Sequence, residues 1–179
     1  GKSTTMKTLT GIIPIESGSC WVKDLNIQEK PIEAKQIIGY LPENNPLYWD
    51  MYVQEMLEFQ ASLYQIEDIS ARICEVIEKT GLVNEQHKKI KELSKGYKQR
   101  VGLACAIVHD PKVLILDEPT AGLDPNQIIE IRQLIRDLAQ DKTVLLSTHL
   151  MQEVEAICDE IIVIHQGKIS EMQTGEGKT

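Results

Sequence analysis

The sequence predicts an α/β fold with a mainly parallel sheet, a small antiparallel β meander and an inserted helical block. Short apolar runs such as Val113–Leu116 suit strands that are buried on both faces of a parallel sheet. Segments with helical spacing alternate with these runs, as in α/β domains. A long segment, 51–92, has two amphipathic helical patterns and no strand pattern, so we expect it to be a helical insert.

The first fifty residues predict two helices and three short strands. Met6, Leu9 and Ile12 have helical spacing, which indicates a helix over 3–12. Turns at 17–18 and 23–24 separate two short strands of the meander. The other expected elements are strands over 19–22 and 25–27, a short helix over 31–36, a buried strand over 37–41 and a polar loop over 43–46.

The second half predicts capped helices between buried strands. Ser94 is a good N-cap for a helix that runs to about Val108, and Asp124 followed by Pro125 starts another. Further expected elements are helices over 53–64, 69–77 and 151–158, strands over 143–147 and 161–164, a hairpin turn at 166–167 with its return over 168–171, and a polar tail over 172–179.

Composition limits the class of protein. The chain has 179 residues, 42% apolar and 26% charged, which are values of a globular domain. Its net charge of −8 argues against an extended nucleic-acid surface, so we expect no nucleic-acid partner. The four cysteines form no C-x-x-C pair, which argues against a zinc or redox motif. The longest apolar runs are far shorter than the roughly 18 residues that span a bilayer.

Two carboxylates, Asp117 and Glu118, follow the strand at 113–116 directly. In open α/β sheets, ligands lie beyond the carboxyl ends of the strands, so this pair is placed where a ligand is expected. One interpretation is a metal-binding Asp beside a general base. The other is a strand that simply ends in solvated acidic residues. His149 also follows a strand end, although a single histidine is usually structural.

The chain opens with Gly1-Lys2-Ser3-Thr4, which matches the last part of the P-loop pattern. In that pattern backbone amides and the Lys bind phosphates, and the Ser hydroxyl reaches Mg²⁺. A helix that starts at Lys2 would point its amide groups at an anion. Gly-Lys-Ser also occurs in ordinary loops, so these residues alone do not distinguish a phosphate-binding loop from an ordinary one.

Taken together, five motifs resemble those of the nucleotide-binding domain of ABC transporters. They are 1–4 (the end of Walker A), Leu93-Ser94-Lys95-Gly96-Tyr97 (the signature), 114–119 (Walker B), Ala121-Gly122-Leu123-Asp124 (the D-loop) and Ser147-Thr148-His149 (the switch-histidine motif). The resemblance covers 1 to about 171 and implies a P-loop NTPase core of the RecA-like kind. The variant signature is most similar to that of the bacterial gliding-motility group.

Three departures from the family pattern accompany this resemblance. It implies that the chain is a fragment, without the N-terminal strands, the first part of Walker A and the adenine-stacking aromatic residue. Lys95 and Tyr97 replace the common Gly and Gln of the signature. Glu43 stands where the family usually has the Gln of the Q-loop, which puts its metal-coupling role in doubt.

The resemblance implies that ATP and Mg²⁺ are the ligands. It implies catalytic roles for Glu118 and His149. The nucleotide-binding residues that it implies are Gly1, Lys2, Ser3, Thr4, Ser94, Gly96 and Asp124, and the metal ligands are Ser3, Asp117 and Glu43. It divides the chain into a P-loop core, 1–50 and 98–171, and a helical subdomain with the signature, 51–97.

The same resemblance implies a second ATP-binding subunit, a separate integral membrane permease, and a location in the cytoplasm on the inner face of the membrane. Alternatives are an ABC-type ATPase that acts on ribosomes or chromosomes, a P-loop kinase of small molecules, and a regulatory module that binds ATP without hydrolysing it. The chromosome type is disfavoured, because only about 90 residues separate Lys2 from Ser94 and no sustained heptads lie between them. Glu118 and His149 together argue against the regulatory module.

Overall fold

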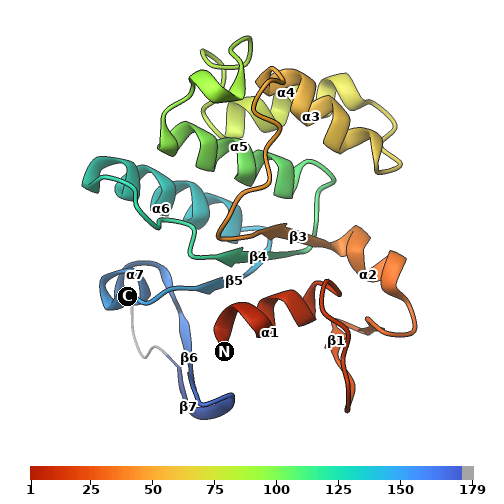
Figure 1. Cartoon of the computed structure of the whole chain (residues 1–179), viewed down its shortest axis with the longest axis vertical. Coiled ribbons are helices and arrows are strands. Elements are labelled where there is room, and N and C mark those ends of the chain that lie inside the picture. The colour runs from red at the N-terminus through yellow and green to blue at the C-terminus, as the bar shows by residue number, and fades with distance from the viewer. Residues whose placement is uncertain (175–179) are drawn as a thin grey trace.

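The computed structural model describes residues 1–174, in which helices and strands alternate along most of the chain (Figure 1). Its helices are α1 (Lys2–Leu9), α2 (Pro31–Ile37), α3 (Val53–Ser62), α4 (Ile69–Lys79), the 3₁₀-helix η1 (Ile90–Glu92), α5 (Lys95–Ile107), α6 (Pro125–Ala139) and α7 (Met151–Ile157). Its strands are β1 (Trp21–Val22), β2 (Leu25–Asn26), β3 (Ile38–Leu41), β4 (Val113–Asp117), β5 (Thr143–Ser147), β6 (Glu160–His165) and β7 (Lys168–Thr174).

A parallel sheet with the order β3-β4-β5 forms the centre of the molecule. In its register Leu114 lies between Gly39 of β3 and Val144 of β5. Asp117, the last residue of β4, lies opposite Ser147, the last residue of β5. Because all three strands run the same way, their carboxyl ends meet at one edge, as expected for a ligand site.

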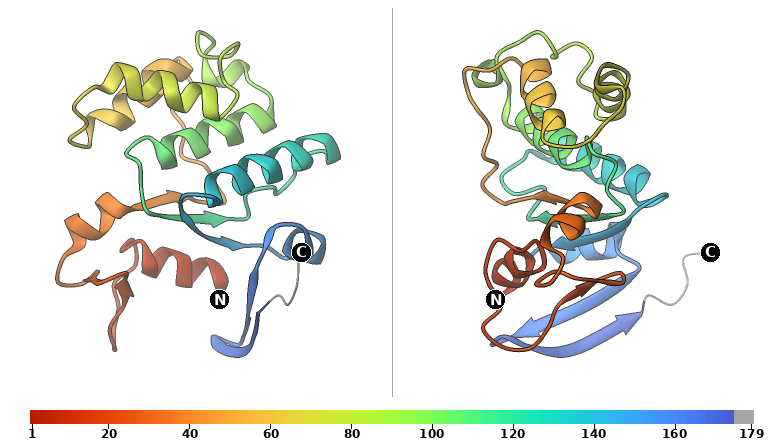
Figure 2. Two further views of the ribbon diagram at one scale, coloured as in Figure 1. Left: turned by 180° about the vertical axis from the view of Figure 1, so that it is seen from behind. Right: turned by 90° about the vertical axis from the view of Figure 1, so that its right-hand side faces the viewer.

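Both faces of β4 are buried, which explains its uninterrupted apolar run. Leu114 and Leu116 belong to the larger core, which contains α5, α6 and the helical insert. Ile115 points to the other face and packs in a smaller core with Met6 of α1 and Ile38. Figures 1 and 2 show the result, with α5 and α6 on one side of the sheet and α1 on the other. The α/β prediction is therefore confirmed.

The segment between β3 and α5 is helical, as its patterns predict. α3 and α4 pack together and against α5, and Ile90 of η1 belongs to the same core. The apolar residues Leu57, Val76 and Leu103 are fully buried there. Gly81, after α4, has a positive φ of 67°, which is the conformation of a helix-ending glycine. This block shares one apolar core with the upper face of the sheet rather than forming a separate one.

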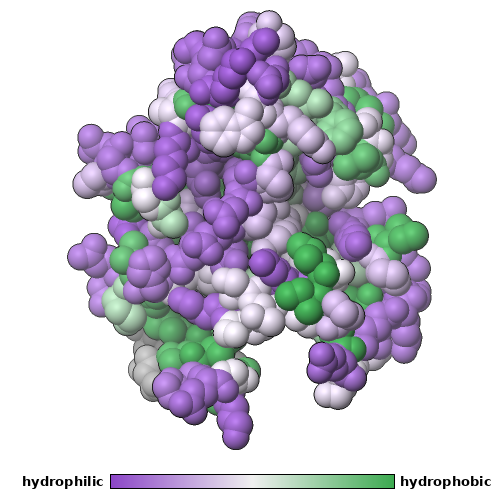
Figure 3. All heavy atoms as spheres, in the orientation of Figure 1, coloured by the Kyte–Doolittle hydropathy of each residue, from purple (hydrophilic) through white to green (hydrophobic). Residues whose placement is uncertain are grey.

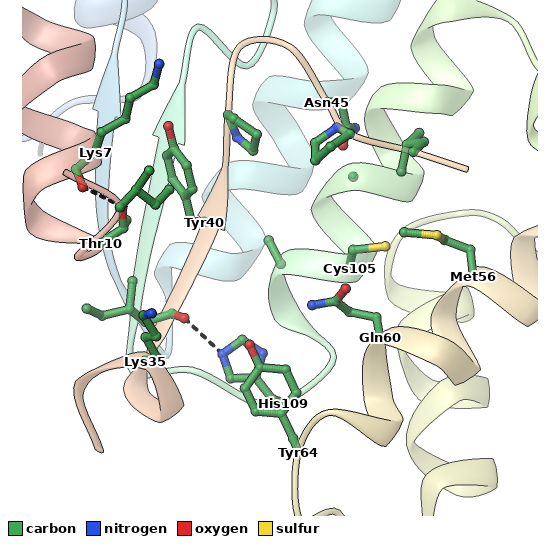
Figure 4. Close-up of a pocket in the computed structure, with 17 residues that line it drawn as sticks. Lys7, Thr10, Lys35, Tyr40, Asn45, Met56, Gln60, Tyr64, Cys105 and His109 are labelled. Atoms are coloured by element: carbon green, nitrogen blue, oxygen red, sulfur yellow. Dashed lines mark hydrogen bonds between the residues drawn. The ribbon is translucent and has the colours of Figure 1, made fainter. Parts of the chain in front are cut away.

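A pocket of about 370 Å³ opens between the sheet and the helical insert (Figure 4). Tyr40 of β3 and Cys105 of α5 line its walls. At one end the His109 ring stacks on Tyr64, with ring centroids 4.0 Å apart, and its Nε2 lies 3.0 Å from the carbonyl oxygen of Ile38. Burial lowers the pKa of His109.

Two antiparallel pairs, β1–β2 and β6–β7, lie outside the central sheet. Gln166 and Gly167 both have positive φ, as a two-residue hairpin turn of type I′ requires. Figure 3 shows apolar side chains near this hairpin and beside α1. Ile162 of β6 and Ile12, which follows α1, are among the exposed apolar residues. β7 continues to Thr174, which is longer than predicted, and the rest of the expected polar tail, 175–179, lies outside the described residues.

Candidate nucleotide-binding site

Asp117 is the centre of a hydrogen-bonded cluster at the carboxyl edge of the sheet. Only 1% of the surface of Asp117 is exposed to solvent. The hydroxyl of Ser3, in the first turn of α1, donates to Asp117 Oδ1 over 3.2 Å, and the hydroxyl of Ser147 donates to the same atom over 2.5 Å. Two segments that are distant from Asp117 in the sequence, α1 and β5, thus place hydroxyl oxygen atoms beside one buried carboxylate.

Glu118 turns away from the strand with a positive φ of 51°, an uncommon conformation for a residue with a side chain. Its amide donates to the carbonyl oxygen of Ser147 over 3.1 Å, which holds the turn against β5. Its carboxylate lies between two nitrogen atoms, with Oε2 2.9 Å from His149 Nδ1 and Oε1 3.7 Å from Lys2 Nζ. The strained backbone therefore aims the carboxylate at a histidine and a cation.

Lys2 lies at the start of α1 and also donates from Nζ to the carbonyl oxygen of Thr148, over 2.5 Å. Gly1 precedes the helix, and Thr4 is exposed in its first turn. The free amide groups of a first helical turn and a lysine ammonium together form a typical site for a phosphate group. The residues at this edge therefore fit a phosphate-bearing ligand.

The oxygen atoms of Ser3 and Asp117 fit Mg²⁺, which prefers hard oxygen ligands. Within the described part of the chain, no three His, Cys, Asp or Glu residues gather in a way that could hold a metal ion. A site that offers one carboxylate and one hydroxyl suits Mg²⁺ held jointly with substrate phosphates, which is its usual mode in phosphoryl-transfer sites.

Glu43 is placed differently from the other predicted metal ligands. It follows β3 by two residues and is therefore near the same edge of the sheet, but its side chain is exposed. No described hydrogen bond or ion pair joins it to Ser3 or Asp117. Its role in metal binding stays a prediction.

The signature and D-loop residues lie at the starts of α5 and α6. Ser94 caps α5 by accepting from the amide of Tyr97 over 3.3 Å, and Asp124 caps α6 by accepting from the amide of Gln127 over 3.0 Å. An added Cβ on Gly96 would lie 2.7 Å from the Gln127 side chain, so any larger residue at position 96 would displace the Gln127 side chain. α5 lies across the sheet from α1 (Figure 1), and no described contact joins Ser94 to Lys2.

Three residues of this region were not singled out from the sequence as site residues. Ser147 was recognised only as part of its motif, although its hydroxyl and carbonyl contact both carboxylate residues. Thr120 and Glu153 were missed altogether, and the Thr120 hydroxyl donates to the Glu153 carboxylate in a buried contact. The spacing of polar residues in the sequence gives no signal for this contact, because it depends on how α7 packs.

Comparison with known proteins agrees with this geometry. The profile of the ABC transporter family matches residues 1–121. The chain is 39% identical over 173 residues to the bacitracin transport ATP-binding protein BcrA of Bacillus licheniformis, a match that covers 96% of this chain and 56% of that protein. The chain spans little more than half the length of the curated relatives that it matches.

Solved structures show the same fold. CbiO1 of Clostridium perfringens, part of the ABC transporter complex CbiONQ, is 30% identical, with a TM-score of 0.87 over 98% of this chain and 73% of that chain. The dimeric bacterial ABC transporter cassette MJ0796 is 23% identical, with a TM-score of 0.85 over 99% and 82% of the two chains. The chain therefore belongs to the ABC transporter family and carries its ATP-binding domain.

Proposed function

We propose that this protein hydrolyses ATP to ADP and phosphate as the nucleotide-binding subunit of an ABC transporter. The observation that carries the proposal is the convergence of Lys2, Ser3, Asp117, Glu118 and His149 at one edge of the sheet. These residues come from α1, the end of β4 and the segments that follow β4 and β5, and each offers a group that phosphoryl transfer needs. The variant signature at 93–97 supports the finer proposal that the chain belongs to the gliding-motility group.

In this mechanism the chain mainly positions groups and offsets charge. Lys2 and the first-turn amides of α1 bind the phosphates of ATP. Glu118 accepts a proton from the water that attacks the γ-phosphorus, and the P–O bond to ADP breaks as phosphate forms. His149, 2.9 Å from Glu118, orients that carboxylate and contacts the γ-phosphate.

Ser3 and Asp117 would hold Mg²⁺, and the ion would offset the charge of the phosphate oxygens. Ser147 fixes the Asp117 carboxylate through a buried hydrogen bond, so the metal ligand is oriented before any ligand arrives. Asp117 and Glu118 are adjacent in the sequence but have separate tasks, because the positive φ at Glu118 sends its side chain in another direction.

A second ATP-binding subunit is part of the proposal. Ser94 and Gly96 lie across the sheet from Lys2, so within one chain they do not complete the site around Lys2. The exposure of Ser94 leaves its hydroxyl accessible to a nucleotide held by a partner. Two copies that face each other would each cap the ATP of the other, and hydrolysis would release them.

The membrane partner is proposed to dock on the helical insert and the loop around Glu43. Tyr48, Trp49, Tyr52 and Phe59 are all at least 40% exposed there, and such aromatic residues are typical of protein interfaces. Among the described residues no helix is both long enough and apolar enough to cross a membrane. We place the protein in the cytoplasm, on the inner face of the membrane, beside a separate permease.

The proposal is tested by measuring phosphate release from MgATP by the purified protein and by its Lys2→Ala variant. We expect release by the wild type and a loss of at least about 10-fold in kcat/KM for the variant, since Lys2 binds phosphate. Arg136→Met, on the outer part of α6, is the matched control and should keep wild-type activity. Absence of ATP-dependent phosphate release, or a phosphorylated small molecule as product, would refute the proposal.

A further inference from the structure

Glu153, on α7, is a buried carboxylate that the mechanism above does not use. It is fully buried, with 0% of its surface exposed. The hydroxyl of Thr120 donates to Oε1, and Oε2 has no hydrogen-bond partner among the described residues. Burying a glutamate side chain with only one hydrogen-bond partner costs free energy, because the side chain loses its contacts with water. The same side chain on the surface would not carry this cost. Its placement therefore calls for a physical explanation.

The two residues of this contact belong to the segments that carry Glu118 and His149. Thr120 lies in the turn that the Ala121 amide closes by donating to the Glu118 carbonyl oxygen over 3.1 Å, and it is 2% exposed. Glu153 is in the first turn of α7, where its amide donates to the carbonyl oxygen of Leu150 over 3.0 Å. The Thr120–Glu153 hydrogen bond thus joins the segment after β4 to the segment after β5.

These segments are also linked by the contact between Glu118 and His149 themselves. That second contact is exposed on its histidine side, since 65% of the His149 side chain is accessible to solvent, compared with 13% of the Glu118 side chain. Water weakens a hydrogen bond that has a solvent-exposed partner, whereas a hydrogen bond in the protein interior is electrostatically stronger and is not screened by water. The buried bond is therefore the better candidate for fixing the distance between the two segments.

We propose that Glu153 is a positioning residue, which acts through Thr120 to hold Glu118 and His149 in the geometry needed for attack on the γ-phosphate. This inference rests on the proposed function, because it assigns a role in the same reaction. Glu153 touches neither Glu118 nor His149 by any described hydrogen bond. It acts on Glu118 through the turn containing Thr120, and on His149 through the start of α7.

The test removes the hydrogen bond from either side. Glu153→Leu and the isosteric Thr120→Val should each lower kcat by at least about 10-fold and change the KM for ATP by less than about 2-fold, because small displacements of catalytic groups are costly. Glu153→Gln and Thr120→Ser keep an acceptor and a donor, and should retain more than half of wild-type kcat. The double variant Glu153→Leu/Thr120→Val should be no slower than the slower single variant.

Arg136→Met is the matched control, because Arg136 also ties α7 to its neighbour. It donates to the carbonyl oxygen of Ala156 over 2.8 Å, at the far end of α7. If this variant lowers kcat as much as Thr120→Val does, general loosening of α7 explains the effect and the inference is wrong. Equal losses of kcat in Glu153→Gln and Glu153→Leu, or additive losses in the double variant, would also overturn it.

A readout without ATP separates this inference from the proposed function. The ¹³C–¹H signal of the His149 ring, assigned with His149→Gln and recorded at one pH, should shift in Thr120→Val but not in Arg136→Met. Thermal unfolding checks that each variant is folded. A wild type without ATPase activity refutes the proposed function, whereas an unchanged His149 signal in folded Thr120→Val refutes the positioning role.

Discussion

Replacing Glu118 by Gln tests whether Glu118 is the general base of the proposed reaction, rather than Glu43, the other carboxylate that follows a strand at this edge of the sheet. The Glu118 carboxylate is 13% exposed and lies within 3.7 Å of Lys2 and 2.9 Å of His149. An amide keeps its shape but does not accept a proton from water. Loss of a general base costs about 10² to 10⁴ in rate, so we expect kcat to fall at least about 100-fold, or about 2.7 kcal/mol of barrier.

Glu43→Gln makes the same chemical change as Glu118→Gln, but at a carboxylate that is exposed to solvent. The Glu43 side chain is exposed, and none of its described contacts reaches Asp117. We therefore expect a loss of less than about 10-fold, or roughly 1.4 kcal/mol, with a changed Mg²⁺ dependence and weaker stimulation by the membrane partner.

Phosphate release at saturating MgATP, with Mg²⁺ varied in a second series, measures both effects. ATP-bound dimers should persist for Glu118→Gln, and size-exclusion chromatography with ATP shows this. The assignment of the base is wrong if Glu43→Gln abolishes hydrolysis at saturating Mg²⁺ while Glu118→Gln is tolerated.

Gly39→Ala should lower the free energy of unfolding by about 3 kcal/mol, because the added Cβ would lie 2.2 Å from the carbonyl oxygen of Ala106; a loss below about 1 kcal/mol in urea denaturation would show that α5 moves aside easily. His109→Phe should flatten the pH dependence of stability below about pH 6.5. Burial lowers the pKa of His109, so the unfolded state binds the proton first and wild-type stability falls on acidification; an unchanged slope in thermal unfolding from pH 7 to 5 would contradict this. Ser94→Arg and Lys2→Ala, each nearly inactive alone, should regain part of the ATPase activity when mixed, and no recovery in proven mixed dimers would exclude a shared site.

Elements with a strong local pattern were predictable from the sequence. Ile73, Val76 and Ile77 have helical spacing, and all three are buried on one face of α4. Element ends were less predictable. α1 was expected to include Ile12 but ends at Leu9, and Ile12 is 57% exposed. An apolar residue just past a helix end has the same spacing as one inside it, so periodicity alone does not locate the end.

The predicted burial of the strand at 143–147 was only partly right. Val144, Leu145 and Leu146 are half-buried in β5. β5 is at the edge of the sheet that the structure describes, so one side of it lacks a neighbouring strand. Strand order depends on contacts between distant segments, and a single sequence does not contain that information in any local pattern.

In the site, too, residues with a local sequence signal were predictable, whereas contacts between distant segments were not. The rule that ligands gather at strand ends is enough to predict, from the sequence alone, that Asp117, Glu118 and His149 share one edge of the sheet. It does not reveal that Ser147 donates to Asp117, because that needs the register of β4 against β5. Glu153 has the sequence signature of an ordinary polar helix residue, and only the packing of α7 shows that it is buried.

The central position of β4 also sets the order in which the chain can fold. Residues 38–41 find their partner only when 113–117 exist, and 113–117 find their second partner only at 143–147. At a synthesis rate of roughly 5–20 residues per second, β3 therefore waits for seconds without its partner strand, and β4 then waits with one edge unpaired. The helical insert, whose contacts are closer in sequence, should fold earlier. If the proposed function is right, the groups for ATP hydrolysis come together late, once His149 has left the ribosome, and a chain interrupted before that point would expose an aggregation-prone strand edge before its site is complete.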